Sequence, residues 1–452
     1  MATLGFYGGV GSVTGANFML DTGKLAVLID CGLVQGDKFA KQQNAEPFTY
    51  NPADIDVLLV THAHADHIGR IPKLVRDGFV GKIYSTAPTR ELAAIMLDDA
   101  VGIMEMEARR DGTTPIYNEA DIDTALGLWQ GVGYHEPVDI GDGITATFTD
   151  AGHILGSAMV QIERNGKKLV CTGDVGNDPQ PLLSPPEVPK DYDYLIMESV
   201  YGDRTHEEVA ERTALLQQHI EHTIAVKGTL IIPAFSLERT QAMLFEINNL
   251  VEQEIIPPIK TFLDSPLAIR VTDVYRHSLE YLKPAVQEQI NEGDDIFAFE
   301  GLSFTESVKE SREIARFGGP KIIIAGSGMS HGGRIRTHEK QFLGETTTTV
   351  LLVGYQTVGS VGRLLQDGAK HVTIDGDDVR VKAKIARIRG YSGHADRDQL
   401  LNLVYRSDAN PKQIFVTMGE EKSSLHLVQR LRDYLGMPAM APAENQEIEI
   451  DF

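Results

Sequence analysis

The sequence predicts an α/β protein in which one domain is inserted into another and a site is built at the ends of β-strands. Three observations support this fold class. The chain has 452 residues, of which 42% are hydrophobic, enough for a large core and two domains. Before about residue 204, short apolar runs end in polar residues. After it, helical segments alternate with apolar runs, which is typical of a parallel sheet.

The first part of the chain holds the predicted strands with polar ends. These strands cover 25–30, 57–60, 145–148, 159–162, 168–171 and 194–198. The spacing of Ile71, Leu74 and Val75 predicts a helix over 68–78, and a longer helix begins near Pro88 and runs to 111. Strands that end in polar residues and lead into loops place a site along one edge of a sheet.

The domain boundaries follow from the change of pattern. Apolar strands at 229–233, 321–325 and 350–353 fall in the alternating part, and a strand at 413–417 falls in the tail. We therefore expect a first domain part over 1–203, an inserted domain over 204–385 and a closing part over 386–452.

The composition argues against several classes of protein. No stretch approaches the roughly 20 apolar residues that cross a bilayer, and the first residues lack a basic segment followed by an apolar run. Only two cysteines occur, Cys31 and Cys171, which fits a reducing cytosol. We therefore expect a cytoplasmic protein that has no membrane partner.

The distribution of charge gives a mixed indication. A net charge of −22 argues against a sequence-independent nucleic-acid binder, which usually has a basic surface. One stretch, 380–397, is nevertheless locally basic. It holds Arg380, Lys382, Lys384, Arg387, Arg389, His394 and Arg397. Composition does not separate a functional basic patch from an ordinary solvated strand face.

A dense group of metal-ligand side chains follows the strand at 57–60. His62, His64, Asp66 and His67 lie within six residues of one another. Imidazole and carboxylate suit zinc, and also manganese or iron. His62 and His64 alternate along an extended segment and share one metal in this interpretation, while Asp66 and His67 turn toward a second.

Two metal positions need ligands from elsewhere in the chain. His153 follows a strand and is flanked by glycines, and Asp174 ends the strand at 168–171. A carboxylate can bridge two metals, which imidazole does not, so Asp174 is the natural bridging ligand. Asp30, at the end of the strand at 25–30, is expected outside the ligand set, where it accepts a proton from a ligand imidazole.

This order of residues resembles the metallo-β-lactamase superfamily, in which an aspartate, a His-x-His-x-Asp-His motif, a histidine and an aspartate follow one another. The resemblance implies an αββα sandwich, two sheets packed face to face with helices outside, and two metal ions at one edge, here expected to be zinc. Two metals lower the pKa of bound water and hold substrate oxygens. Hydrolysis follows from this, whereas the substrate stays open.

Further motifs resemble the β-CASP branch, which processes nucleic acids, and within it bacterial relatives of the nuclease subunit of the cleavage and polyadenylation specificity factor. The matching stretches are 197–204 (MESVYGDR), 232–241 (IPAFSLERTQ), 264–266 (DSP), 325–329 (AGSGM), 332–334 (GGR), 353–356 (VGYQ) and 389–396 (RGYSGHAD). The resemblance implies that the inserted domain, with its parallel sheet, is a β-CASP domain. It also implies RNA as the partner and leaves a homodimer open.

The same resemblance assigns roles to residues. His394 supplies a proton to the leaving group as general acid, Glu198 orients that imidazole, and Asp66 completes the catalytic set. In the inserted domain, Ser236, Ser327, Gly328 and Met329 are expected to contact phosphates through hydroxyl and backbone groups, and Arg334 to pair a phosphate. Plain turns between strands and helices remain the alternative for these five residues.

The chain departs from the family pattern at one position. RNA-cleaving members usually carry a His-Gly-Glu tripeptide after the last long strand, where this chain has Met418, Gly419 and Glu420. Methionine is a poor ligand for a hard or borderline cation, so the second metal site is expected to be weakened. His426, further along the chain, is the one local substitute, and it is expected in the middle of a helix.

We predict a metal-dependent RNA endonuclease that hydrolyses phosphodiester bonds, with 5'–3' exonuclease activity left open. Two alternatives remain. One is a non-catalytic RNA-binding member of the family whose second metal site is impaired at Met418. The other is a small-molecule thioester hydrolase, which the Glu198 and His394 pair and the long inserted domain argue against.

Overall fold

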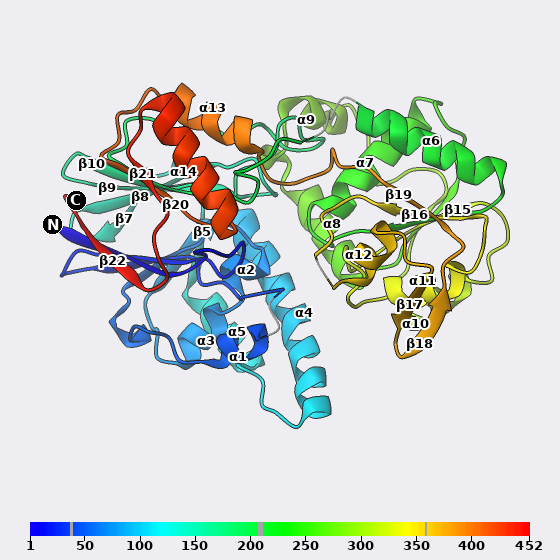
Figure 1. Ribbon diagram of the computed structural model, residues 1–452, viewed down its shortest axis with the longest axis horizontal. Helices are drawn as coiled ribbons and strands as arrows, with labels where there is room; N and C mark the ends of the chain where they lie inside the picture. Colours follow the sequence, from blue (N-terminus) through cyan, green and yellow to red (C-terminus); the bar gives the residue numbers. More distant parts are fainter. Residues whose placement is uncertain (37–38, 207–210, 358) are drawn as a thin grey trace. The chain divides into compact units, whose positions relative to one another are not determined.

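The structure is a computed structural model that describes residues 1–36, 39–206, 211–357 and 359–452. The chain forms two compact units (Figure 1). The first comprises 1–178, 184–205 and 394–452, and the second comprises 179–183 and 206–393. The predicted α/β class with an inserted domain is confirmed.

Two sheets of seven strands form the first unit. In sheet order, the first contains β22 (Gln446–Ile450), β1 (Ala2–Gly8), β2 (Asn17–Asp21), β3 (Ala26–Ile29), β4 (Val57–Leu59), β5 (Lys82–Thr86) and β6 (Trp129–Val132). The second contains β21 (Ala439–Met440), β20 (Gln413–Val416), β11 (Tyr194–Met197), β10 (Lys167–Cys171), β9 (Ala158–Arg164), β8 (Ile144–Asp150) and β7 (Val138–Gly141). The two sheets are mixed, with parallel pairs from β3 to β6 and from β10 to β21.

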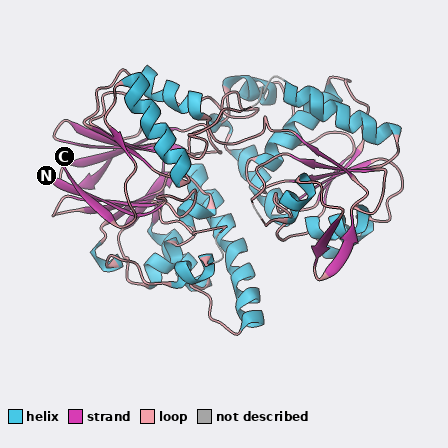
Figure 2. Ribbon diagram, viewed as in Figure 1, coloured by secondary structure: helices cyan, strands magenta, loops and turns pink. Residues whose placement is uncertain are grey.

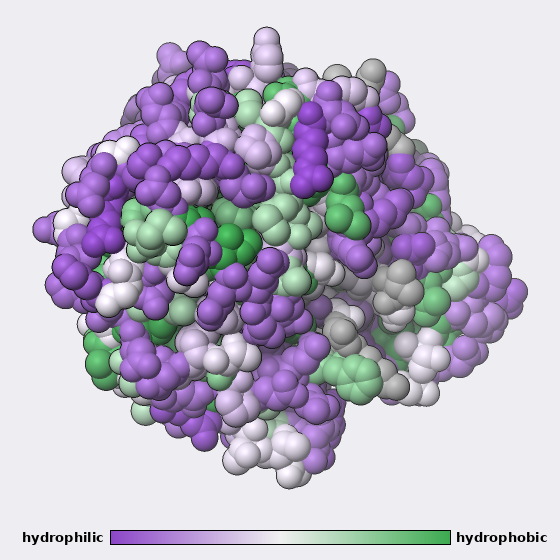
Figure 3. Space-filling view, turned by 60° about the vertical axis from the view of Figure 1, so that its left-hand side comes forward, coloured by the Kyte–Doolittle hydropathy of each residue, from purple (hydrophilic) through white to green (hydrophobic). Residues whose placement is uncertain are grey.

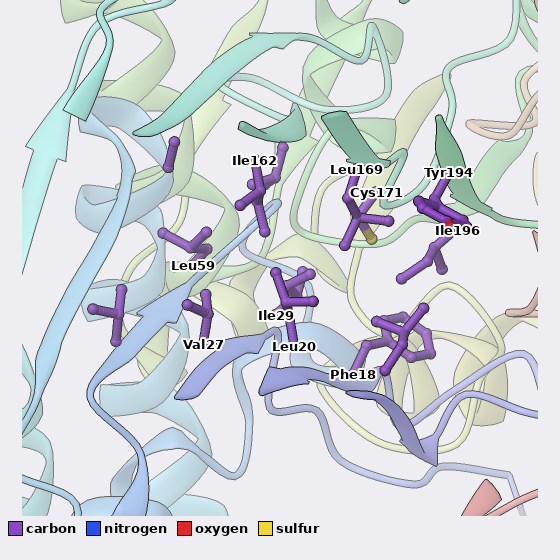
Figure 4. Close-up of a cluster of buried hydrophobic side chains, with 14 of the residues drawn as sticks. Phe18, Leu20, Val27, Ile29, Leu59, Ile162, Leu169, Cys171, Tyr194 and Ile196 are labelled. Atoms are coloured by element: carbon purple, nitrogen blue, oxygen red, sulfur yellow. The ribbon is translucent and has the colours of Figure 1, made fainter. Parts of the chain in front are cut away.

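The main core of this unit lies between the two sheets. Figure 4 shows side chains of the first sheet, among them Phe18, Val27 and Ile29, pointing toward Ile162 and Leu169 of the second. Burying this apolar surface is the principal term that holds the sandwich together, at about 25 cal/mol per Å². The core fixes the two sheets against each other and so fixes the loops at their shared edge.

Helices cover the outer faces of both sheets (Figure 2). The helices on the side of the first sheet are α1 (Ala40–Ala45), α2 (Ala65–Ile68), α3 (Ile71–Arg76), α4 (Ala87–Asp111) and α5 (Glu119–Leu128), with a 3-10 turn, η1 (Pro52–Asp54). On the second sheet, α13 (Arg397–Ser407) and α14 (Glu421–Leu435) share a core with β10, β11 and β20. The predicted αββα layering is confirmed.

The helix predicted over 68–78 is two short helices, α2 and α3. Pro72 has no N–H and is tolerated only in the first turn of a helix. It stands at that position of α3, which begins at Ile71. The break between the helices leaves α2 as a single turn that carries Asp66 and His67.

The second unit is built around a parallel sheet of six strands. In sheet order these are β14 (Leu302–Phe304), β13 (Lys260–Leu263), β15 (Lys321–Ala325), β12 (Thr229–Pro233), β16 (Thr348–Leu352) and β19 (Lys384–Arg387). The helices are α6 (Arg212–Ala225), α7 (Arg239–Glu252), α8 (Pro266–His277), α9 (Pro284–Asn291), α10 (Val308–Ile314), α11 (Ile335–Phe342) and α12 (Val361–Gln366), with η3 (Leu279–Tyr281). A hairpin of β17 (His371–Ile374) and β18 (Asp377–Arg380) precedes β19.

The boundary expected between 385 and 386 is wrong, because it would cut β19. This strand pairs with β16 in the parallel sheet, and the second unit continues to 393. The sequence pattern hid this, since β19 is short and basic and lacks the apolar run of the central strands. The first boundary, expected after 203, falls close to the end of the first unit's segment at 205.

The surface shown in Figure 3 is mostly hydrophilic, and its hydrophobic residues form only small separate groups. Within the described parts of the chain, no helix combines the length and the apolar character needed to span a membrane.

Candidate metal centre

Three histidines and one aspartate converge at one edge of the sandwich. His62 and His64 follow β4, His153 follows β8 and Asp174 follows β10. Nδ1 of His64 lies 3.0 Å from Nε2 of His62 and 3.2 Å from Nε2 of His153. Oδ2 of Asp174 lies 3.4 Å from Nε2 of His62 and 3.5 Å from Nε2 of His153. All four ligand atoms are within 4.8 Å of one another.

These separations fit a single bound cation. Donor atoms that lie about 2.0–2.1 Å from a tetrahedral zinc are roughly 3.3 Å from one another. Burial lowers the pKa of His62 and of His64 well below the usual range, so both imidazoles are neutral and keep a lone pair for a cation. The donor set suits zinc, and manganese or iron accept similar ligands.

A second group of donors faces the other oxygen of Asp174. Nε2 of His67 lies 3.4 Å from Oδ1 of Asp174 and 4.0 Å from Oδ2 of Asp66. Within the described part of the chain, His67 Nε2 and Asp174 Oδ1 are buried and have no hydrogen-bond partner. Because buried polar atoms are normally paired, these two fit a second cation. Asp174 thus presents one oxygen to each group, as a bridging ligand would.

Asp30 and Thr61 orient the imidazoles from behind. Asp30 has a positive φ of 59° at the end of β3, which turns its carboxylate toward the histidine loop. Oδ2 of Asp30 lies 2.7 Å from Nδ1 of His67, and it accepts a hydrogen bond of 2.8 Å from the Thr61 hydroxyl. This contact leaves Nε2 of His67 free for a cation, the usual arrangement for a metal-binding histidine.

Sequence reasoning gave Thr61 no role. Its hydroxyl oxygen also lies 3.0 Å from Nδ1 of His62, so one side chain links Asp30 to two ligand histidines. The only signal in the sequence was its place directly before His62.

Glu198 and His394 meet beside this group of ligands. Glu198 directly follows β11, and the His394 loop is held by a 2.7 Å hydrogen bond from the Ala395 N–H to the Val175 carbonyl. Nδ1 of His394 lies 3.3 Å from Oε1 of Glu198 and 3.8 Å from Oδ2 of Asp174. Burial lowers the pKa of His394, but the two carboxylates outweigh burial and raise it to about 9. The imidazole is therefore protonated at neutral pH.

Asp174, Glu198 and His394 also lie close enough to ligate a cation among themselves. We interpret them otherwise, because the carboxylate of Glu198 is already engaged. Its Oε1 accepts a hydrogen bond of 2.6 Å from the Val175 N–H, and its Oε2 accepts one of 3.2 Å from the Val200 N–H. A carboxylate held in this way is placed to orient an imidazole rather than to bind a metal.

Met418 belongs to the core between the sheets and is 2% exposed. Its N–H donates a hydrogen bond of 2.6 Å to the Gly9 carbonyl. A side chain at Gly9 would begin only 2.5 Å from the Met418 sulfur, so the absence of one makes room for the thioether. His426 lies in α14, where Nε2 accepts a hydrogen bond of 3.3 Å from Arg430, so it does not substitute for the missing histidine.

The hydroxyls predicted to contact RNA lie at the C-terminal ends of β12 and β15. Ser236 Oγ is 3.3 Å from Ser265 Oγ, at the end of β13. Ser327 Oγ accepts hydrogen bonds of 3.1 Å from the His331 N–H and 3.3 Å from the Gly332 N–H, so this hydroxyl also shapes its own loop. This edge of a parallel sheet is where such folds usually bind ligands.

Gly328 and Met329 complete that loop. A Cβ at Gly328 would lie 2.8 Å from the Phe235 ring, so this position needs glycine for close packing. Gln356 donates a hydrogen bond of 3.0 Å to the Gly328 carbonyl, and Thr357 donates one of 3.3 Å to the Met329 sulfur.

Arg334 is held by groups of the inserted domain. It donates hydrogen bonds of 2.7 Å to Asp264 Oδ1, 3.0 Å to the Thr305 carbonyl and 2.5 Å to the Glu306 carbonyl. Asp264 is fully buried, and His338 Nε2 lies 2.6 Å from its other oxygen. These contacts hold the guanidinium beside the 326–334 loop, and the phosphate contact of Arg334 stays a prediction. The partner, Asp264, is distant in sequence and was given no role.

The fold and the converging ligands define the chain as a metallo-hydrolase. Three family models match it: a metallo-β-lactamase superfamily domain over residues 19–184, a β-CASP domain over 240–365 and a Zn-dependent metallo-hydrolase RNA specificity domain over 378–442. The chain belongs to the β-CASP branch of the metallo-β-lactamase superfamily.

Characterised relatives match over nearly the whole chain. A ribonuclease of Thermus thermophilus is 35% identical, with 92% of this chain and 93% of that protein covered. An RNase J-like protein of Methanocaldococcus jannaschii is 30% identical, with both chains fully covered. Transcription termination factor FttA of Methanosarcina mazei is also 30% identical, over 93% of this chain and 67% of that protein.

The fold is shared with a crystal structure of a protein of unknown function from Enterococcus faecalis. The TM-score is 0.58 at 12% identity, and 99% of each chain is covered.

Proposed function

We propose that this metal-dependent RNA nuclease cuts phosphodiester bonds within the RNA chain, as an endonuclease. The observation that carries the proposal is the adjacency of two sets of atoms. One set is the ligand group of His62, His64, His153 and Asp174, and the other is the His394–Glu198 pair, 3.8 Å from Asp174. A thioester hydrolase has no need of the second set, because a thiolate leaves without a proton.

The ligand group supplies the first half of the chemistry. A bound cation activates water and holds a phosphate oxygen. Asp30 and Thr61 fix the ring orientation of the ligand imidazoles, and Asp174 spans the two groups of donors. Asp66 and His67 form the second group of donors, opposite Oδ1 of Asp174.

The other half is proton transfer to the leaving oxygen of the RNA. His394 is 26% exposed, so its ring reaches solvent while Nδ1 is held by Glu198. The positively charged ring donates a proton to the leaving 3'-oxygen as the phosphorus–oxygen bond breaks. Glu198 steadies the ring through this change and is fixed by two backbone N–H groups.

Contacts to the RNA backbone come from the strand ends of the inserted domain. Ser236 and the loop of Ser327, Gly328 and Met329 offer hydroxyl and N–H groups at the C-terminal edge of the parallel sheet. Backbone contacts of this kind position a nucleic acid without reading its sequence. The location in the cytosol and the homodimer remain predictions.

We test the activity with circular RNA, which has no ends. Purified protein stripped of metal is incubated with zinc, manganese or no metal, and products are separated by size. Linear products that depend on metal are expected. A protein that degrades only linear RNA from one end is an exonuclease, and a protein that binds RNA but leaves both forms intact is the non-catalytic alternative.

Met418→His tests the weakness proposed for the second metal position. Position 418 follows β20, which runs parallel to β11, so both strands end at the edge that carries Glu198. An imidazole there adds a nitrogen donor where the thioether adds none, and the second metal is expected to bind roughly 10- to 100-fold more tightly. Calorimetric titration of metal-free protein with zinc measures this. Leu427→His, at another buried site, is the control. Unchanged affinity in Met418→His would show that position 418 does not face the metal.

A further inference from the structure

The segment that follows the β17–β18 hairpin concentrates positive charge. Between residues 379 and 390 the chain has Lys or Arg at five positions and no Asp or Glu, although the whole chain has 64 acidic and 42 basic residues. Four of them, Arg380, Lys382, Lys384 and Arg387, are called the basic edge here. All four are exposed.

The backbone sorts this segment into two faces. Val379 and Ala383 are buried in the core of the inserted domain, and Val381 packs against it. The charged residues between these apolar positions are exposed. β18 ends at Arg380 and β19 begins at Lys384 after a bend at Ala383, so Arg380, Lys382 and Lys384 lie along the connection between the two strands.

The acids closest in sequence are committed to other partners. Asp375 pairs with Arg336 at 2.8 Å, Asp378 with His371 at 2.8 Å, and Asp377 with Lys340. None of the carboxylates in the described part of the chain lies within 4.0 Å of a basic-edge nitrogen. Uncompensated charge of this kind is unexpected on an ordinary solvated face, since the chain has acids in excess and adjacent like charges repel.

The location of the basic edge in the sheet leaves it accessible. β19 is the outermost strand of the six-stranded sheet, and among the described residues no further strand pairs with its free side. A pocket of about 120 Å³ next to it is lined by Arg387 and Arg389, together with the acidic Glu211. Lys384 lies close enough to α6 to lower the pKa of His219, after the larger effect of burial.

We propose that the basic edge, whose residues all belong to the second unit, binds the phosphate backbone of single-stranded RNA. This rests on the proposed function. The partner follows from what the basic edge offers: four exposed positive charges and no exposed apolar side chain, because the valines and alanine of the segment pack against the core. A membrane surface or a protein partner normally engages apolar groups as well. A polyphosphate chain needs only the charges.

The test measures binding without cleavage, in protein that carries Asp174→Asn. Fluorescence anisotropy of labelled oligouridine is recorded over a range of salt concentrations. Each phosphate contact to a single strand contributes about −0.7 to the slope of log K against log salt. Changing Arg380, Lys382, Lys384 and Arg387 together to Gln is expected to lower the magnitude of that slope by about 2 to 3 and to weaken binding at least tenfold at low salt.

A matched control removes the same charge from residues that have acidic partners. Lys41, Arg109, Arg110 and Arg363 pair with Glu107, Glu105, Asp111 and Asp367. Their joint change to Gln is expected to alter RNA affinity less than twofold. Thermal unfolding of both variants verifies that each is folded.

The outcomes separate this proposal from the nuclease activity. An equal loss in the control and the basic-edge variant overturns the proposal, because the effect would then be one of net charge. An unchanged slope of log K against log salt overturns the proposal too. If the basic-edge variant instead loses binding to phosphatidylserine vesicles, the basic edge binds a membrane surface. If RNA binding shows the expected salt dependence but wild-type protein never cleaves RNA, the proposed role of the basic edge in RNA binding is kept and the nuclease assignment fails.

Discussion

Asp174→Asn is expected to remove tightly bound metal and to slow RNA cleavage by at least about 10³-fold, a loss of about 4 kcal/mol in transition-state stabilisation. Asp174 faces both groups of donors, with Oδ2 toward His62 and His153 and Oδ1 toward His67. Asparagine keeps the size of the side chain but has no charge and a single oxygen. It therefore cannot serve both positions.

Three measurements together make this prediction specific. Elemental analysis gives the metal content per chain, circular RNA gives the cleavage rate, and thermal unfolding with and without zinc gives the stabilisation by metal. A ligand at 100 times its Kd stabilises the native state by about 2.7 kcal/mol, and this increment should vanish in the variant. Asp193→Asn, at the opposite end of β11 from Glu198, is the control and should retain all three properties. Full metal content in Asp174→Asn would contradict the ligand assignment.

His394→Ala is expected to lower RNA cleavage by about 10² to 10⁴-fold while the metal content stays the same. The four-donor group does not include His394, so its loss leaves that group intact. The effect should depend on the leaving group. Bis(p-nitrophenyl) phosphate releases a phenolate that needs no proton, so a general acid contributes little to its hydrolysis. Hydrolysis of this ester by His394→Ala should therefore fall less than about tenfold.

The comparison of the two substrates decides the role of His394. An equal loss on RNA and on the activated ester would show that His394 positions the site and does not donate a proton. Glu198→Gln is expected to lower the rate of RNA cleavage by less than His394→Ala does, as befits a positioning residue. The imidazole remains in this variant, but its Nδ1 contact of 3.3 Å is weakened. Metal content is measured in both variants, so that a displaced ligand is recognised.

Much of this centre could be predicted because its information is local. Three histidines and an aspartate within six residues, placed directly after an apolar strand, fix both the ligand types and their neighbourhood. The same holds for α4, where Thr86 caps the first turn and Gly112 ends the helix with a positive φ. These features depend on residues a few positions apart, and local geometry is set by such neighbours.

The errors and omissions arose where the partner is distant in the chain. Arg334, for which the resemblance implies a phosphate contact, shows what the sequence left out. In the folded chain its guanidinium is held by the buried Asp264, 70 residues earlier. The end of the inserted domain was misplaced for a related reason: β19 is defined by its pairing with β16, and its own sequence carries little apolar signal.

The sequence by itself determined the chemistry of the ligands, the order of the strands that carry them and the position at which the family's histidine is missing. Ligand type, strand pattern and motif spacing are properties of short stretches of chain, so they can be recognised before folding. Only the tertiary structure decided that Asp174 turns one oxygen to each group of donors, that Met418 packs over Gly9 in the core, and that the acids near the basic edge are paired elsewhere. These are relations between distant residues, and packing of the sheets and loops fixes them.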